Sequence, residues 1–173
     1  MKKDIDSHYQ ILGNIGEGTY STVFKAVDQR TDQVVALKRV KIRKAEEGLP
    51  KEFVREIESL QRLLHENIIK VEEIFIGKTN INIVYPFCEC DLDQLMSAKI
   101  VKPLTISQIR FLMKQLLTGL QRMHGIGLMH RDIKPSNLFL YLHSDCEDVD
   151  KKVQLKLGDF GQARLIPKDK PNP

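Results

Sequence analysis

The hydrophobic pattern changes part of the way along this chain, and the change limits the folds that the chain can adopt. In about the first ninety residues, short segments rich in β-branched side chains alternate with tight turns, which favours an antiparallel sheet. Strands are predicted at 9–16, 22–29, 34–41, 68–77 and 81–87. The later residues predict helices at 92–100 and 105–125 and a hairpin with strands at 137–142 and 153–158. We therefore predict an α+β fold of two lobes, residues 1–88 and 89–173.

The helix of the first lobe carries an acid beside its apolar stripe. It is expected to start near Pro50, a residue favoured in a first helical turn, and its stripe is Phe53, Ile57, Leu60 and Leu64. Glu56 lies on the edge of that stripe, where an unpaired charge would be costly. Lys38 in the third strand would by default extend along the surface, but it is a natural partner for Glu56. A lysine held in this way can contact phosphate oxygens.

The long helix at 105–125 has clear boundary signals. Thr105 and Gln108 have capping-box spacing, and Gly125 is a plausible stop. One apolar stripe contains Ile109, Leu112, Leu116, Leu120 and Met123, and further apolar residues lie off it: Phe111, Met113 and Leu117. This helix is expected to need packing partners on several faces.

Composition excludes some classes of protein. The net charge of +4 is scattered along the chain, which does not indicate a dedicated nucleic-acid surface. We find neither a signal peptide nor an apolar run of about eighteen residues, so we expect no membrane partner and a location in the nucleus, the cytoplasm or both. The three cysteines, Cys88, Cys90 and Cys146, favour free thiols over a zinc site. The acidic turn at 143–152 favours a solvated loop over a metal loop.

The segment HRDIKPSN at 130–137 carries the strongest chemical signal. Taken singly, Asp132 could cap a turn, Asn137 could be a turn amide and His130 could be a packed core imidazole. Together with the segment Asp159-Phe160-Gly161, they supply an acid to orient a hydroxyl and an amide and an acid to hold Mg²⁺. Lys134 lies beside them. These are the residue types that phosphoryl transfer requires.

The order of the motifs resembles the protein kinase signature set: GEGTYSTV, VALK, Glu56, HRDIKPSN and DFG. The segment PKEFVRE at 50–56 is similar to the PSTAIRE-type segment of cyclin-dependent kinases. Thr19-Tyr20 and CECDLDQLM also match that group. The resemblance implies a bilobal kinase fold, with a β-rich first lobe containing one main helix and an incomplete, mainly helical second lobe.

The resemblance also implies roles for individual residues. ATP would be bound by Ile15, Gly16, Gly18, Val23, Ala36, Lys38, Pro86, Cys88, Asp91 and Phe139, with Tyr85 at the gatekeeper position. Lys38 would contact the α- and β-phosphates, anchored by Glu56. Asp132 would orient the substrate hydroxyl and Lys134 would assist at the γ-phosphate. Asn137 and Asp159 would hold Mg²⁺, and Thr19 and Tyr20 would be regulatory. The implied partners are a protein substrate with Ser or Thr and a cyclin-like activator at residues 50–65.

Three features differ from the family pattern. Ser21 replaces the third loop glycine, and its Cβ restricts the backbone there. The hairpin turn at 142–152 is longer than usual. The sequence stops at DFGQARLIPKDKPNP, without an activation loop, an Ala-Pro-Glu segment or the later helices, so we expect the peptide-substrate platform to be missing.

Three interpretations stay open at this point. The chain is a fragment of a cyclin-dependent-kinase-like Ser/Thr kinase, a natural short form that binds nucleotide or a cyclin-like partner as a decoy, or a nucleotide-binding fold with another use. The presence of Asp132 argues against the third, because a protein that only binds nucleotide has no need of that acid.

Overall fold

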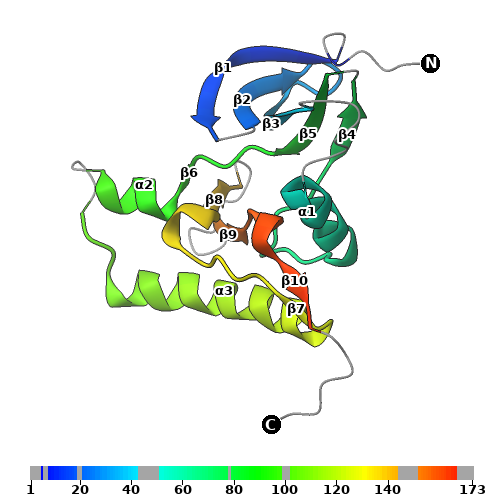
Figure 1. Cartoon of the computed structure of the whole chain (residues 1–173). Helices are drawn as coiled ribbons and strands as arrows, with labels where there is room; N and C mark the ends of the chain where they lie inside the picture. Colours follow the sequence, from blue (N-terminus) through cyan, green and yellow to red (C-terminus); the bar gives the residue numbers. More distant parts are fainter. Residues whose placement is uncertain are drawn as a thin grey trace. The chain divides into compact units, whose positions relative to one another are not determined.

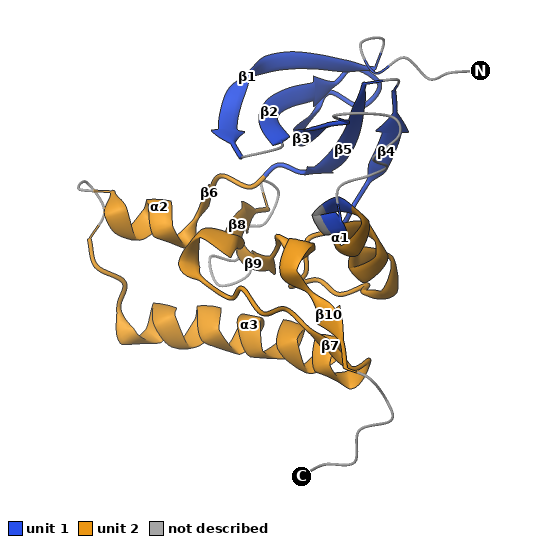
Figure 2. Cartoon of the chain, viewed as in Figure 1, with its two compact units in different colours: residues 1–53, 70–87 blue, residues 54–69, 88–173 orange. Residues whose placement is uncertain are grey.

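The computed structural model describes residues 5, 8–18, 21–42, 51–77, 79–98, 102–143 and 152–166. The chain divides into two compact units, residues 1–53 with 70–87 and residues 54–69 with 88–173 (Figure 2). The second unit thus takes in most of the helix that the sequence assigned to the first lobe. The division into lobes at residue 88 stays a prediction.

The first unit is a five-stranded antiparallel sheet in the order β1-β2-β3-β5-β4 (Figure 1). Its strands are β1 (Tyr9–Glu17), β2 (Ser21–Asp28), β3 (Gln33–Lys41), β4 (Glu73–Ile76) and β5 (Asn80–Pro86). Strands were expected in all five regions, so the sheet prediction is confirmed. One face forms the core of this unit, built from Tyr9, Ala26, Val35, Leu37, Phe75 and Val84.

A polar cluster fastens strands of this sheet that are distant in sequence. Arg30, in the β2–β3 turn, donates from Nη2 to Asp28 Oδ2 at 2.6 Å and to Glu73 Oε2 at 2.9 Å. The Tyr9 hydroxyl donates to the same oxygen of Glu73 at 2.6 Å. Burial and this hydrogen bond raise the pKa of Tyr9 well above its usual range, while Arg30 lowers the pKa of Asp28. The cluster therefore joins β1, the turn and β4, with Tyr9 protonated and Asp28 ionised at neutral pH.

The second unit contains the helices and two small sheets. Its elements are α1 (Lys51–Arg62, shared with the first unit at its start), β6 (Cys90–Asp91), α2 (Leu92–Ser97), α3 (Ile106–Gly125), β7 (Leu128–Met129), η3 (Pro135–Asn137), β8 (Leu138–Leu142), β9 (Val153–Leu157), η4 (Phe160–Gln162) and β10 (Arg164–Leu165). The sheets are β6-β8-β9 and β10-β7. The predicted hairpin is confirmed as β8 and β9. Within the described parts of the chain, no helix has the length and apolar character needed to cross a membrane.

Helix α3 confirms the capping prediction and the predicted stop, and it corrects the predicted stripe at Ile109. The Thr105 side chain accepts from Gln108 N, and the Gln108 side chain accepts from Thr105 N. The buried residues are Leu112, Leu116, Gly119 and Met123, whereas Ile109 is 42% exposed. The helix ends at Gly125, as the sequence predicted. The chain turns away at Gly127, whose φ of 72° is costly for other residues.

Helix α1 buries Phe53, Glu56 and Leu60, but Leu64 does not extend this stripe. The helix ends at Arg62, so residues 63 and 64 no longer follow the helical period. Leu63 is buried in place of Leu64, which is 76% exposed. The prediction for Leu64 was therefore wrong. Pro50, where the helix was expected to begin, lies outside the described residues.

The segment after α1 is tied to both α3 and β9. The Asn67 side chain donates from Nδ2 to Gln115 Oε1 at 2.9 Å and to the Leu155 carbonyl at 3.0 Å. The Asn67 carbonyl accepts from Leu157 N at 2.9 Å. Gly119 permits this approach, because a Cβ at that position would lie 3.2 Å from the Asn67 carbonyl oxygen. These bonds fix the strand that leads into Asp159.

A substitution at Gly158 tests how closely the main chain before Asp159 packs against the Phe139 ring. A Cβ at residue 158 would lie 2.6 Å from Phe139 Cε2, a distance that real Cβ contacts do not adopt, so Gly158→Ala must displace the ring. We expect a loss of about 1–3 kcal/mol in the free energy of unfolding, measured by chemical denaturation. The matched control is Gly125→Ala at the end of α3, where a Cβ meets nothing within 4 Å. It should be neutral or stabilise by up to about 1 kcal/mol. Equal effects of the two substitutions would contradict this account.

Candidate active site

The segment between β7 and β8 brings three of the predicted site residues together. Lys134 Nζ donates to Asp132 Oδ2 at 2.8 Å, and Asn137 Nδ2 donates to the same oxygen at 3.1 Å. The Asn137 amide also donates to the Asp132 main-chain carbonyl at 2.8 Å. The short η3 turn starting at Pro135 folds Asn137 back onto Asp132. One oxygen of the carboxylate is thus held by both a cation and an amide.

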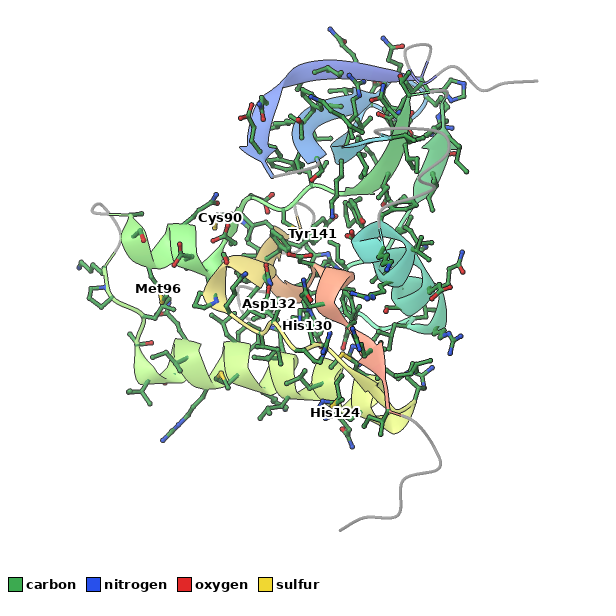
Figure 3. The ribbon with its side chains drawn as sticks, in the orientation of Figure 1. Cys90, Met96, His124, His130, Asp132 and Tyr141 are labelled. Atoms are coloured by element: carbon green, nitrogen blue, oxygen red, sulfur yellow. The ribbon has the colours of Figure 1, made fainter. Side chains whose placement is uncertain are left out.

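His130 supports this segment from beneath. Its ring is almost fully buried and packs edge-on against Phe160, with centroids 4.8 Å apart. Figure 3 shows His130 beside Asp132. Nδ1 accepts from Asp132 N at 3.3 Å, so Nε2 carries the hydrogen and donates to the Gly158 carbonyl at 2.9 Å. Burial lowers the pKa of His130 below its usual value, which keeps the ring neutral. The sequence suggested that His130 could be a packed core imidazole, and the structure shows it in that role.

Asp159 follows β9 in a left-handed conformation, with φ 58° and ψ 72°. Its side chain is exposed, while the next residue, Phe160, is fully buried. The main chain of Gly158 donates to the Asn137 carbonyl at 3.0 Å, which brings the residue before Asp159 against Asn137. The hydrogen bond of Gly158 and the burial of Phe160 fix the main chain on both sides of Asp159. The exposed carboxylate of Asp159 therefore extends from a defined position.

Asn137 and Asp159 have the donor atoms that Mg²⁺ prefers. The Asn137 amide nitrogen is engaged by Asp132, which leaves its oxygen as the atom it can offer to a cation. Across the residues that the structure describes, no group of three or more His, Cys, Asp or Glu could hold a metal by itself. One carboxylate and one amide fit Mg²⁺ that also binds substrate phosphates, because this ion usually takes few protein ligands.

The electrostatics of Asp132 suit a carboxylate that stays ionised. The hydrogen bond from Lys134 is the largest cause of its lowered pKa, and the Asn137 amide acts in the same direction. Asp132 in turn raises the pKa of Lys134. At neutral pH the pair is therefore a carboxylate and an ammonium, and Asp132 can accept a hydrogen bond from a hydroxyl without first losing a proton.

The first unit places its predicted nucleotide residues on one face of the sheet. Val23 lies opposite Lys38, and Ala36 lies opposite Tyr85. Strand alternation puts these side chains on the face opposite the Leu37 core. Ile15 is a bulge residue in β1, because Asn14 pairs with Phe24 and Gly16 with Val23. Ile15 is exposed on the strand beside them.

The glycine-rich turn is described up to Gly18. Gly18 N donates to the Ser21 carbonyl at 2.7 Å, and a Cβ at Gly18 would lie 3.2 Å from Ser21 Oγ. Ser21 itself pairs with Val40 as the first residue of β2, so the serine is accommodated in the strand. The proposed regulatory residues, Thr19 and Tyr20, lie outside the described residues.

The predicted adenine and ribose residues lie at the last residue of β5 and in β6. Pro86 pairs with Val35, and Asp91 pairs with Phe139 across β6 and β8. Asp91 has a structural duty that sequence reasoning missed, since its Oδ1 accepts from Gln94 N at 2.8 Å and caps α2. The ribose role of Asp91 stays a prediction. The described cysteines, Cys88 and Cys90, are free thiols, and burial raises the pKa of Cys88 to about 12.

Lys38 and Glu56 belong to different compact units. Glu56 is buried on α1, as its place beside the apolar stripe suggested. Both side chains take part in interactions. Their pairing with each other stays a prediction.

Comparison with known proteins adds to this geometry. Residues 9–172 match the family model described as the protein kinase domain. The chain is 39% identical over 173 residues to cyclin-dependent kinase 12 of Caenorhabditis elegans, covering 94% of this chain and 22% of that protein. It is 41% identical over 158 residues to cyclin-dependent kinase 11B of Rattus norvegicus (90% and 34%). It is 39% identical over 158 residues to cyclin-dependent kinase 10 of Mus musculus (90% and 41%). The chain spans less than half the length of each.

Lys134→Met tests the electrostatics of the site. We expect it to raise the pKa of Asp132 toward the ordinary aspartate value of about 3.9, because it removes the largest cause of the lowering. The ionised Asp132 stabilises the native protein above the unfolded-state pKa, and this contribution is lost as pH falls through the lower native pKa. The ¹³C shift of the Asp132 carboxyl across a pH titration measures the change. Lys114→Met on α3 is the control, and a wild-type Asp132 pKa in Lys134→Met would refute the assignment.

Proposed function

The chain belongs to the protein kinase family, and from this premise we propose that it carries the catalytic machinery of a cyclin-dependent-kinase-type Ser/Thr kinase. The reaction is transfer of the ATP γ-phosphoryl group to a Ser or Thr hydroxyl of a protein. A nuclear or cytoplasmic location is part of this proposal. Because the chain covers only part of its relatives, the activity, substrates and partners of a whole protein are included in what we propose.

The arrangement of Asp132, Lys134 and Asn137 carries the proposal. A carboxylate kept ionised by a lysine is suited to accept the hydrogen bond of an attacking hydroxyl and so to aim its oxygen. Lys134 brings a positive charge to the place where negative charge would gather on the transferred group. A protein that only bound nucleotide would not need this acid.

Two further residues would hold the metal that this reaction uses. Asn137 through its amide oxygen and Asp159 through its carboxylate are the ligands that we propose for Mg²⁺. Bound Mg²⁺ supplies neutralisation of phosphate charge. Within the chain itself, the bond from Asn137 to Asp132 couples the metal ligand to the hydroxyl-orienting acid, so movement of one displaces the other.

The nucleotide would be bound by the residues on the sheet face of the first unit and by those after β5. Val23 and Ala36 offer an apolar surface, and Lys38 offers a cation two residues further along the same strand face. Pro86 has no N–H, so it can contribute only its carbonyl to adenine, as the family pattern requires. Asp91 Oδ2 is suited to a ribose hydroxyl.

A second candidate function is binding without transfer. In this alternative the chain binds nucleotide or a cyclin-like protein and competes with a longer kinase. The observation that favours it is the placement of Val23, Ala36 and Lys38 on one face of the sheet, which would serve binding alone as well as transfer.

Asp132→Asn and Asp159→Asn separate the two candidate functions. We expect Asp132→Asn to lower phosphoryl transfer to a mixture of Ser- and Thr-containing peptides by about 100-fold or more, with little change in the Kd of ATP. Asp159→Asn should weaken ATP binding in the presence of Mg²⁺ but not in its absence, measured by calorimetry. Asp93→Asn, an exposed acid on α2, is the control for both.

The outcomes are distinct. Transfer that survives Asp132→Asn at the wild-type rate would refute the assigned mechanism. Binding of Mg²⁺-ATP that depends on Asp159, without transfer by the wild-type chain, would support the binding-only function. An ATP affinity that depends neither on Mg²⁺ nor on Asp159 would refute the metal assignment.

The relatives are named as cyclin-dependent, and we propose that a cyclin-like activator contacts residues 50–65. Leu64 at the end of this region is a large apolar side chain that is 76% exposed, as at a protein interface. Leu64→Asp should weaken binding of a recombinant cyclin about 10-fold or more in surface plasmon resonance. Met96→Asp, an exposed apolar residue on α2, is the control. Equal affinities of the two variants would place the contact elsewhere.

A further inference from the structure

A cation–π contact joins Lys25 to Phe87. Lys25 lies in the middle of β2, and Phe87 is the first residue after β5. Lys25 Nζ is 4.3 Å from the centroid of the Phe87 ring. At this distance an ammonium is attracted to the negative face of an aromatic ring. Both residues are half-buried and belong to the first unit, so the contact is a feature of that unit alone.

The contact reaches across one strand of the sheet. In the order β1-β2-β3-β5-β4, strand β3 lies between the strand that carries Lys25 and the strand that leads to Phe87 (Figure 1). The residue opposite Lys25 in β3 is Ala36, and the residue opposite it in β1 is Gly13. Directly opposed residues share a face of the sheet, and these two are the smallest residue types. Lys25 can therefore extend across β3 without meeting a large side chain at its own level.

Lys25 lies on the face that carries the predicted nucleotide residues, but away from the glycine-rich turn. Lys38, the predicted phosphate ligand, pairs with Val23 near the start of β2. Lys25 pairs with Ala36, two residues further from the turn on the same face. Its ammonium contacts the ring of Phe87, in the segment where the base is predicted to bind. The two lysines of this face therefore serve different ends of the predicted nucleotide site.

We propose that Lys25 is a positioning residue for the nucleotide, because it holds the Phe87 ring and so fixes the main chain that is to contact adenine. This inference rests on the proposed function, which assigns adenine to the end of β5. Pro86 has a fixed φ and pairs with Val35 in the β3–β5 ladder. Phe87 lies beyond that ladder, and the ammonium of Lys25 holds its ring instead. The base would therefore meet a segment that is held at both of its residues.

A role for Lys25 as a second phosphate ligand fits the geometry less well. Lys25 and Lys38 lie on neighbouring strands, in successive cross-strand pairs of one face. An ammonium that bound phosphate would be directed toward Lys38 and the glycine-rich turn. The ammonium of Lys25 instead lies against a ring that follows β5. The positioning role and the phosphate role predict different responses to ligands that carry only part of ATP.

Adenosine and tripolyphosphate separate these two roles. In calorimetry on the full chain, Lys25→Met should weaken adenosine binding about 5-fold, because the apolar stem stays and the charge on the ring is lost. It should leave the binding of tripolyphosphate with Mg²⁺ unchanged. Lys25→Arg should restore the wild-type affinity for adenosine, since a guanidinium also binds an aromatic face. The control is Lys41→Met, a change of an exposed lysine of β3 on the other face of the sheet.

The aromatic ring gives a second, independent test. Phe87→Leu keeps an apolar side chain and removes the ring, so it should weaken adenosine binding as much as Lys25→Met does. The double variant should bind no more weakly than either single variant, because both changes remove the same contact. In NMR spectra of the wild-type chain, the ring should shift the ε-methylene protons of Lys25 upfield, and Phe87→Leu should abolish that shift. Additive losses of affinity, or unshifted protons in the wild-type chain, would overturn the inference.

The outcomes also separate this inference from the proposed function. ATP binding and phosphoryl transfer that are unchanged in Lys25→Met would overturn the inference and leave the proposed function in place. Weaker tripolyphosphate binding in Lys25→Met, with unchanged adenosine binding, would make Lys25 a phosphate ligand and would also overturn the inference. Adenosine binding that depends on Lys25, in a chain that transfers no phosphoryl group, would support the inference while the proposed transfer function fails.

Discussion

The contact between Asn137 and Asp132 is the interaction on which the candidate site depends. One amide nitrogen donates both to the Asp132 carbonyl and to its carboxylate, so a single side chain sets the backbone path and the direction of the acid. Because the amide nitrogen forms both of these hydrogen bonds, the side-chain oxygen of Asn137 is the atom left to bind a cation. One set of hydrogen bonds thus holds both the proposed hydroxyl-orienting acid and a proposed Mg²⁺ ligand, in a segment with almost no regular structure.

The position of Asp159 relies on groups that never touch a substrate. Gly158 permits the close approach of the Phe139 ring and bonds to the Asn137 carbonyl, and neutral His130 donates to the carbonyl of Gly158. Phe160 fills the space beside His130. The exposed carboxylate of Asp159 therefore extends from a main chain whose neighbouring residues are buried and hydrogen-bonded. Protonation of His130 would give Nδ1 a hydrogen directed at the Asp132 N–H, and burial opposes this by lowering the pKa of the ring.

Local signals in the sequence predicted the elements well and the connections between them poorly. Strand alternation gave the sheet with Ala36 and Lys38 on one face, and the capping box at Thr105 gave the start of α3. The prediction that Leu64 belongs to the apolar stripe was wrong because the helical period applies only within the helix. The Asn67–Gln115 link joins residues 48 apart, and neither residue type at its position announces a partner. The capping role of Asp91 follows from its spacing to Gln94, which is the spacing of a capping box.

The connections that sequence could not predict also relate α3 to the site. Gln115 accepts from the main chain of Leu155 and from Asn67, and these bonds fix β9, which ends two residues before Asp159. The Asn67 carbonyl also accepts from Leu157 N, so α3, the segment after α1 and β9 hold one another. The position of Asp159 therefore depends on hydrogen bonds between residues that are far apart in the sequence, and no local pattern in the sequence predicts such bonds.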